Sequence, residues 1–300
     1  MKKIFFSIIT LAAFTACNKN NDIISSHHPV AEAGLITFGV SELVATKAVS
    51  ESTGETVKAT GFNVAGVTSD GVKYFNELAT YSGGSYLTAK NYYYPSGKTM
   101  DFYAVHPINE DIILNGAEAS VEYSQSKYED LIVAKKTSVT AQAGDVELTF
   151  DHILSQLGFT AKGADAGVSY KLNSIVVNAP NGGIYTFEDG YWNRGELVDE
   201  EFWNTSIDVS TSEPTVIEET MTFLPGAIVV TVDWDTYVDG EHIANYVKST
   251  PVATSSDAIS LEQGKKNTIN LILPNASAQG ISFNVSVNSW GETSQDVTLN

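Results

Sequence analysis

Apolar residues alternate with polar or small ones in short runs along most of this chain, and that period of two limits its fold more than any other feature. In the first run, Ile36, Phe38 and Val40 alternate with Thr37 and Gly39. Side chains of a β-strand point alternately to its two faces, so such runs indicate strands with one buried face. Clusters of Gly, Ser, Asp and Pro separate the runs, as turns do. The sequence therefore predicts an all-β fold.

The expected strands form two blocks along the chain. The first block has candidate strands at 35–40, 62–67, 72–76, 91–94, 100–105, 130–134 and 146–150. The second block has candidate strands at 171–178, 183–187, 219–223, 227–234, 244–248, 267–273 and 281–287. The alternation predicts these core-facing sets: Phe62/Val64, Phe102/Ala104, Val146/Leu148/Phe150, Leu172/Ser174/Val176, Ile228/Val230/Val232, Ile269/Leu271/Leu273 and Ile281/Phe283/Val285/Val287.

Residues 151–158 depart from this alternation. Ile153, Leu154 and Leu157 follow helical spacing, and Gly158 can end a helix. The sequence predicts one short helix in this stretch, between the two blocks of strands.

The chain of 300 residues is longer than a typical single domain. Residues 161–167 are mostly small, and two of them are glycines, so we place a domain boundary there. Many short strands with frequent turns are typical of antiparallel sandwiches. We therefore expect two β-sandwich domains in tandem, an N-terminal one at 35–160 and a C-terminal one at 168–300.

The N-terminal residues have the features of an export signal. Lys2 and Lys3 precede an apolar run from Ile4 to Phe14, which is shorter than the roughly 20 residues that a membrane-spanning helix needs. We interpret residues 1–16 as a signal peptide that is removed. The protein is therefore expected to act outside the cytoplasm.

Cys17 is the only cysteine, so it has no internal disulfide partner. The sequence Phe14-Thr15-Ala16-Cys17 resembles the lipobox at which bacterial lipoproteins are acylated, for example with palmitate, and then cut. The alternative is an ordinary secretory signal that has a cysteine at this place by chance. With acylation, residues 17–34 would be a flexible tether between the lipid anchor and the first domain, and the protein would be held at the cell outer membrane.

The chain is strongly acidic, with a net charge of −19 that becomes −21 once Lys2 and Lys3 are lost with the signal. Nucleic acids and anionic lipid headgroups bind clustered positive charge. We therefore expect no nucleic-acid partner, and contact with the membrane through the lipid anchor alone.

Few residues have the pattern of a catalytic or metal site. The motifs HExxH, GxSxG and paired cysteines are all missing, and the histidines at 27, 28, 106, 152 and 242 are scattered. Asp233 and Asp235 lie on the same side of an expected strand, as in some hydrolases and calcium sites, but one strand does not set the spacing that such a pair needs. We expect no enzyme activity, cofactor or metal.

Aromatic residues crowd into segment 185–203. Tyr191, Trp192 and Trp203 lie there among polar and acidic residues, together with Tyr185 and Phe202. Exposed aromatic faces can stack on sugar rings or anchor a partner protein, whereas aromatic residues of a hairpin can also cover a sheet. The sequence leaves both interpretations open.

Several segments in chain order resemble the fimbrillin family of lipoprotein pilus subunits, the Mfa-like and FimA-like proteins. The segments are Ile36-Thr37-Phe38, Thr46-Lys47-Ala48, Tyr92-Tyr93-Tyr94-Pro95, Met100 to Pro107, Leu148 to Leu157, Leu224-Pro225-Gly226, Leu261 to Thr268 and Val287-Asn288-Ser289-Trp290. The resemblance implies two transthyretin-like β-sandwich domains, which agrees with the two blocks of strands.

The resemblance also implies assembly by strand exchange. In the family, a protease cuts after the first strand, that strand leaves, and a strand of the next subunit fills the groove. Here the leaving strand would carry Ile36, Phe38 and Val40, and the cut would fall between Lys47 and Ala48, where relatives commonly have arginine. The implied partners are other fimbrillin-type subunits and a host or bacterial surface receptor.

The role within a fimbrium stays open. The tail after Trp290 is short, and only Val297 and Leu299 alternate in it, so it would be a modest donor strand. Both a stalk subunit and a tip adhesin fit that tail. Two other hypotheses remain: a surface glycan-binding lipoprotein that uses segment 185–203, and a hydrolase that uses Asp233 and Asp235.

Overall fold

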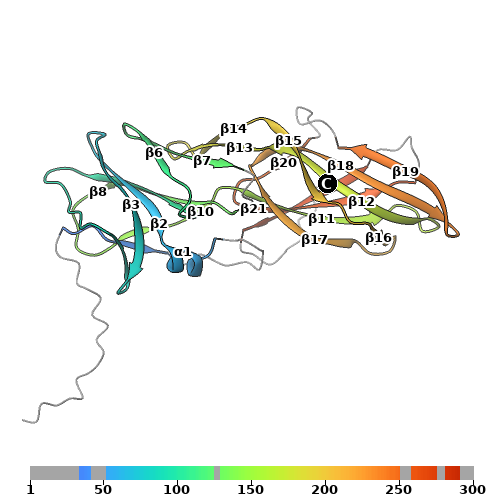
Figure 1. The fold of residues 1–300 in the computed structure, drawn as a ribbon, viewed down its shortest axis with the longest axis horizontal. Coiled ribbons are helices and arrows are strands. Elements are labelled where there is room, and N and C mark those ends of the chain that lie inside the picture. Colours follow the sequence, from blue (N-terminus) through green and yellow to red (C-terminus); the bar gives the residue numbers. More distant parts are fainter. Residues whose placement is uncertain (1–33, 42–51, 125–128, 251–257, 276–280, 291–300) are drawn as a thin grey trace, which may run out of the picture.

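The computed structural model describes residues 34–41, 52–124, 129–250, 258–275 and 281–290. This part of the chain forms four β-sheets and one short helix, which confirms the predicted all-β class (Figure 1). No helix within it has the length and apolar character needed to cross a membrane. The predictions for residues 1–16, Cys17, Lys47, Ala48 and the C-terminal tail lie outside the described residues.

The first sheet has eight strands and builds the N-terminal half. Their order is β10-β8-β5-β2-β3-β4-β1-β9. The strands are β1 (Phe38–Val40), β2 (Phe62–Thr68), β3 (Lys73–Ser82), β4 (Ser85–Thr88), β5 (Met100–His106), β8 (Ile132–Val139), β9 (Val146–Leu148) and β10 (Asp151–His152). Of the expected strand at 91–94, only an isolated bridge between Leu35 and Tyr93 is present.

Both faces of this sheet are buried, because its middle strands supply two separate cores. Phe62 and Val64 of β2 point into one core, whereas Ala65 and Val67 point into the other. The same division holds in β5 and β8. The first core, which we call the groove core, draws on every strand of the sheet except β10, so the sheet curves around it. The inward sets Phe62/Val64, Phe102/Ala104 and Val146/Leu148/Phe150 are confirmed.

A second sheet covers the other face. Its order is β14-β13-β7-β6, with β6 (Ile112–Asn115), β7 (Glu118–Ser124), β13 (Gly182–Thr186) and β14 (Tyr191–Arg194). The hairpin β13–β14 belongs to the second block of the sequence, yet β13 pairs with β7 of the first. Tyr185, Phe187 and Trp192 of this hairpin complete the core on that face. The two halves are therefore interleaved, and the division at 161–167 stays a prediction.

Two further sheets pack face to face in the C-terminal half. One has the order β17-β11-β21-β22, and the other runs β15-β12-β18-β19, with β16 beside β12 and β20 beside β18. A single core lies between the sheets, and it includes the confirmed sets Ile228/Val230/Val232 and Ile269/Leu271/Leu273. The strands are β11 (Ser155–Gly163), β12 (Ser169–Pro180), β15 (Leu197–Trp203), β16 (Ile207–Val209), β17 (Thr215–Phe223), β18 (Gly226–Val238), β19 (Glu241–Ser249), β20 (Ile259–Leu261), β21 (Lys265–Leu273) and β22 (Ser282–Ser289).

The predicted helix at 151–158 is wrong. The stretch forms β10 and the start of β11, which pairs with β17 on one side and β21 on the other. Leu154 and Leu157 point into different cores, so the run is apolar on both faces of a strand. Periodicity alone does not distinguish such a run from a buried helix. The one helix of the described residues is α1 (Gly54–Thr60), where Thr53 caps the first turn.

The set Leu172/Ser174/Val176 needs a correction as well. A β-bulge between Leu172 and Ser174 shifts the register of β12 against β18. After the bulge, Ile175 and Val177 are buried, and Ser174 and Val176 are only partly buried. One extra residue in a strand exchanges its two faces, which a strict alternation does not foresee. The last set, Ile281/Phe283/Val285/Val287, is partly buried along β22.

Candidate functional site

The first strand, β1, lies inside its sheet rather than at the edge. It pairs in parallel with β9 over Phe38–Val40 and antiparallel with β4 at Tyr86. Among the described strands, β9 has no other partner in a sheet. Removing β1 would therefore leave an open slot between β4 and β9, with unpaired backbone groups on both sides.

Backbone hydrogen bonds hold the whole segment 34–41 in this slot. On one side the segment bonds to the loop before β5, and on the other to β9. The bonds are Ile36 N to Tyr92 O at 2.8 Å, Tyr94 N to Gly34 O at 2.9 Å, Val146 N to Thr37 O at 2.8 Å and Ser41 N to Leu148 O at 3.0 Å. A side-chain bond from Thr37 to Asp145 adds to them. Backbone hydrogen bonds therefore hold the segment on both sides, although only Phe38–Val40 is a β-strand.

The side chains of this segment seal the groove core. Ile36 and Phe38 are buried, and Val40 is half-buried against the same core. The ring of Phe38 crosses the core to the middle of the sheet, with its centroid 6.1 Å from that of Phe62 and 5.4 Å from that of Phe102, both edge-on. A fully buried Phe or Ile side chain contributes about 1.5–3 kcal/mol by burial alone. The core is thus closed by one short piece of chain.

The chain is anchored again directly after residues 42–51. Ser52 N donates to Asp130 Oδ2 at 2.9 Å, and Ser52 Oγ donates to Asp130 O at 3.1 Å. The carboxylate of Asp130 is buried and also lies 2.8 Å from His152 Nδ1. Helix α1 follows, and its Val57 is part of the groove core. The two pieces of chain that flank the predicted cut at Lys47 and Ala48 are therefore held by separate contacts.

The rim of the groove core favours uncharged side chains. Burial raises the pKa of the Tyr86 and Tyr94 phenols, which stay protonated at neutral pH. Nearby, burial lowers the pKa of His106, whose Nδ1 lies 2.9 Å from Gly61 O. Gly61 ends α1 with φ of 84°, and a Cβ atom there would collide with Ala79 O. An apolar strand is the ligand that such surroundings fit.

The aromatic residues of segment 185–203 do not share one exposed face. Trp192 is buried, and its Nε1 donates to Ile153 O at 3.0 Å. Tyr191, its neighbour on β14, points the other way and is 64% exposed. Trp203 is half-buried against the core of the C-terminal half. Of the two interpretations that the sequence left open, Tyr185 and Trp192 fit the second, in which aromatic residues of a hairpin cover a sheet.

Asp233 and Asp235 lie within a network of amide groups on the outer face of β18. Asn173 Nδ2 donates to both carboxylates, at 3.2 and 2.9 Å, and Asn245 Nδ2 does so at 2.7 and 3.1 Å. His242 Nε2 lies 3.0 Å from Asp235 Oδ1. Burial acts to raise the pKa of Asp235, but these hydrogen bonds hold it below its usual value. A carboxyl group in that state is a poor proton donor.

The remaining sequence candidates are scattered in the structure. The His106 and His152 rings lie in the N-terminal half, and the His152 ring stacks on Trp290 with centroids 4.4 Å apart. No three His, Cys, Asp or Glu side chains of the described residues are grouped as a metal site would need. Residues 27 and 28 lie outside the described residues.

Sequence reasoning missed the residues that hold β1 and the chain after it. Asp145 directly precedes the expected strand at 146–150 and had no expected contact, yet its carboxylate accepts the bond from Thr37. Asp130, which anchors Ser52, was expected only to begin a strand. Both contacts join residues that are far apart in sequence, so the only available signal was a polar residue directly beside an apolar run.

Comparisons with known proteins agree with this architecture. A family model described as fimbrillin-like matches residues 40–290. The chain is similar in fold to a crystal structure of a fimbrial protein from Bacteroides vulgatus, with a TM-score of 0.64 at 16% identity over 86% of this chain and 99% of that one. A proposed cell adhesion protein from Parabacteroides distasonis has a TM-score of 0.53 at 10% identity, covering 88% and 98%. The comparison with curated proteins gives no match.

Proposed function

Because this chain belongs to the fimbrillin-like family, we propose that it is a fimbrial subunit or tip adhesin that assembles by strand exchange. In this proposal the protein is exported as a lipoprotein acylated at Cys17, is held at the outer membrane and faces the cell exterior. Cleavage between Lys47 and Ala48 then frees the first strand, with Ile36, Phe38 and Val40, and a strand of another subunit takes its place. The observation that carries the proposal is the position of β1 between β4 and β9.

The slot explains why a donated strand would bind. Once β1 leaves, the backbone groups of β4 and β9 that it paired are unsatisfied, and a buried unpaired group costs about 1–3 kcal/mol. The pockets of Ile36 and Phe38 in the groove core are opened to water at the same time. A strand with apolar residues at alternate positions satisfies both needs at once.

The two anchors explain why cleavage need not unfold the domain. The leaving strand is held by β4, β9 and the groove core, whereas the chain after the cut is held by the bonds of Ser52 to Asp130. Helix α1 would stay in place and keep Val57 at the wall of the groove. A cut in segment 42–51 therefore separates the first strand from the subunit without removing other parts of the core.

The test is to cut the soluble protein, residues 18–300, with a lysine-specific protease and to follow assembly by size-exclusion chromatography and electron microscopy. The variant Lys47→Gln controls for the cleavage site. A second control carries Gly39→Cys and Glu147→Cys, because these residues lie directly opposite each other on β1 and β9. Neighbouring strands lie ~4.8 Å apart, which suits a disulfide.

We expect the cut protein to form head-to-tail polymers and the Lys47→Gln variant to stay monomeric. The disulfide variant should stay monomeric after cutting and polymerise once the disulfide is reduced. Cut protein that remains monomeric at high concentration contradicts the proposal, as does polymerisation with β1 still locked in place.

The rival glycan-binding role for segment 185–203 has less support. It needs Tyr191, Trp192 and Trp203 to present a common platform, but Trp192 is buried and Trp203 lies on β15, in another sheet. We propose neither a catalytic role nor a cofactor. A surface receptor remains part of the proposal for an adhesin at the tip.

A further inference from the structure

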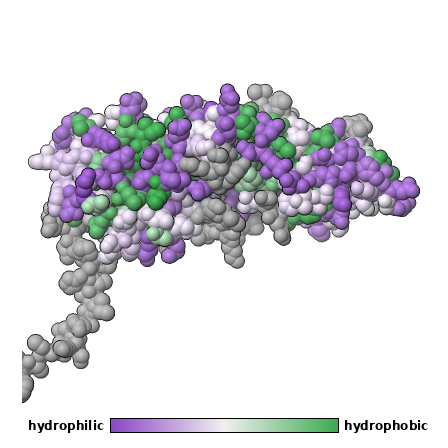
Figure 2. Space-filling view, in the orientation of Figure 1, coloured by the Kyte–Doolittle hydropathy of each residue, from purple (hydrophilic) through white to green (hydrophobic). Residues whose placement is uncertain are grey.

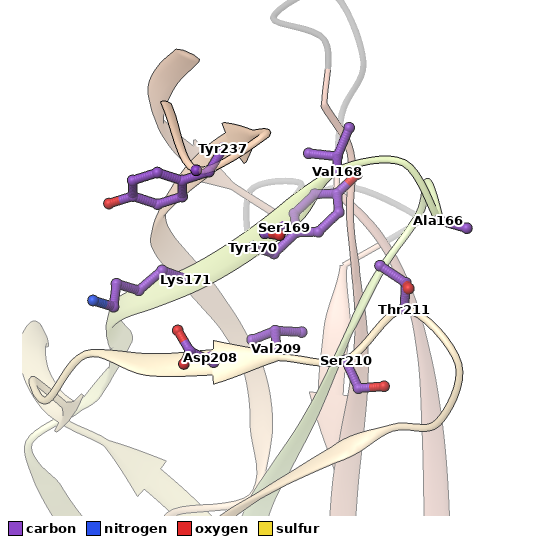
Figure 3. Close-up of a pocket in the computed structure, with 11 residues that line it drawn as sticks. Ala166, Val168, Ser169, Tyr170, Lys171, Asp208, Val209, Ser210, Thr211 and Tyr237 are labelled. Carbon is purple, nitrogen blue, oxygen red and sulfur yellow. The ribbon is translucent and has the colours of Figure 1, made fainter. Parts of the chain in front are cut away.

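A polar pocket of about 660 Å³ opens in the C-terminal half, where β12, β16 and β18 end. Its lining includes Ser169 and Lys171 of β12, Asp208 of β16 and Tyr237 of β18. Figure 3 shows Lys171 on β12, with Tyr237 beyond one edge of that strand and Asp208 beyond the other. Figure 1 places β16 and α1 in opposite halves of the molecule. The pocket is therefore separate from the slot of β1.

The strand register brings these groups together. Lys171 lies opposite Asp208 on one side and opposite Asp235 on the other, and Ser169 lies opposite Tyr237. Within the described residues, the side chains of Lys171 and Asp208 make no hydrogen bond or ion pair. The pocket thus presents the free ammonium group of Lys171, the free carboxylate of Asp208 and the ring of Tyr237.

The far wall of the pocket is fixed by its own hydrogen bonds. The backbone of Ser210 bonds to Thr215 Oγ1 at 3.0 Å and to Gly163 N at 2.9 Å. The hydroxyl of Ser210 accepts bonds from Ser212 N and Glu213 N, at 3.1 and 3.2 Å. Because these bonds already order the wall, a ligand would bind without the entropic cost of ordering it, which favours binding.

We propose that this pocket binds a neutral saccharide of one or two rings. Each sugar hydroxyl both donates and accepts, so it can bond to Asp208 and to Lys171 at once, and the apolar face of a sugar ring can stack on Tyr237. The volume lies within the range of small-molecule sites. Charged ligands fit less well, because an anion would meet the Asp208 carboxylate, whereas a cation would meet the Lys171 ammonium group.

The pocket is independent of strand exchange, since none of its lining residues belongs to the slot or to the groove core. It would give an adhesin a place to hold a surface sugar. The same pocket should bind its ligand whether or not β1 has been removed, so the disulfide-locked protein can be used in the test.

The experiment is saturation-transfer NMR on residues 18–300 with glucose, galactose, mannose, N-acetylglucosamine and lactose, followed by titration of the sugar that responds. We expect Tyr237→Ala to weaken binding by about tenfold or more, since it removes the stacking face, and Asp208→Asn to weaken it less. Tyr191→Ala, which removes an exposed ring in the other half, is the control and should bind as the parent does. Thermal unfolding of each variant verifies that it is folded.

Four results would overturn the proposal. The first three are no saturation transfer from any of these sugars, binding that survives Tyr237→Ala unchanged, and binding of glucuronate or glucosamine alone. A folded Asp208→Asn variant with full affinity would remove the carboxylate from the site and contradict the proposed geometry.

Discussion

The two halves of this protein close their cores in different ways. In the C-terminal half, β12 and β18 are twelve and thirteen residues long and pair with each other along most of that length. In the N-terminal half, the groove core is closed by β1, which has three residues and joins the rest of the domain through residues 42–51. One core is made of long continuous strands, and the other is closed by one short strand.

In the proposed strand exchange, this difference would give the two halves different tasks. The proposed exchange needs a piece that can leave and a slot that stays shaped, and the proposal places both at the groove core. The C-terminal half has its apolar sets on long central strands, so it can remain folded while the slot is empty. Figure 2 shows hydrophilic residues over most of the face of that half, whereas the largest hydrophobic area on this face lies over the half with β3 and β6.

The largest expected effect comes from removing the first strand. A protein that begins at residue 42 lacks Ile36, Phe38 and Val40, and each of the fully buried side chains contributed about 1.5–3 kcal/mol. We expect two unfolding transitions in calorimetry, with the N-terminal one shifted to a lower temperature and the C-terminal one unchanged. Binding of a hydrophobic dye should rise, because the groove core is exposed.

A peptide with the sequence of residues 34–41 should reverse both changes when it is added in excess, since a ligand of the folded state stabilises it. A peptide with Phe38 replaced by Ser is the matched control. If the shortened protein melts as the parent does, β1 is not needed to close the core, and the contrast between the halves is wrong.

The next largest effect compares one side chain in each core. Phe38→Ala should cost about 3–5 kcal/mol, and Leu271→Ala in the C-terminal core about 2–5 kcal/mol. We expect Phe38→Ala to affect only the N-terminal transition and Leu271→Ala only the C-terminal one. Urea unfolding followed by hydrogen exchange on β2 and β18 would distinguish them. Equal loss of protection in both strands, for either variant, would show that the two cores unfold as one unit.

The sequence predicted the parts of this contrast that depend on local alternation. Phe62 and Phe102 face the groove core as expected, and the long C-terminal sets around Val230 and Leu271 are buried. A period of two reports which side chains are buried, because it is a property of one strand at a time. Residues 35–40 were expected to form a strand for the same reason, although β1 itself is shorter.

The pairing of strands could not be predicted in this way. β1 pairs with β9, which is more than a hundred residues away in the sequence. The alternation of apolar and polar residues in each strand does not indicate which strand it pairs with. For the same reason, the sequence did not predict the strands at residues 151–158, whose apolar side chains pack into two different cores. It also did not predict that Trp192 is buried, because that residue lies in a segment rich in polar residues. Tertiary contacts decided these cases.

The smallest expected effect is a difference in how the two halves respond to acid. Burial lowers the pKa of His106 in the N-terminal half, so the unfolded chain binds a proton more readily than the folded one. That half should therefore lose stability as the pH falls below 6.5, the ordinary value for histidine. In the C-terminal half, hydrogen bonds lower the pKa of Asp235, and the resulting stability is lost only as the pH falls below 3.8.

Urea unfolding at pH 7.5 and 5.5 should thus shift the N-terminal transition alone. The variant His106→Gln, which has no such proton to bind, should reduce that shift. A C-terminal transition that moves equally over this range would show that the acid response does not separate the two halves.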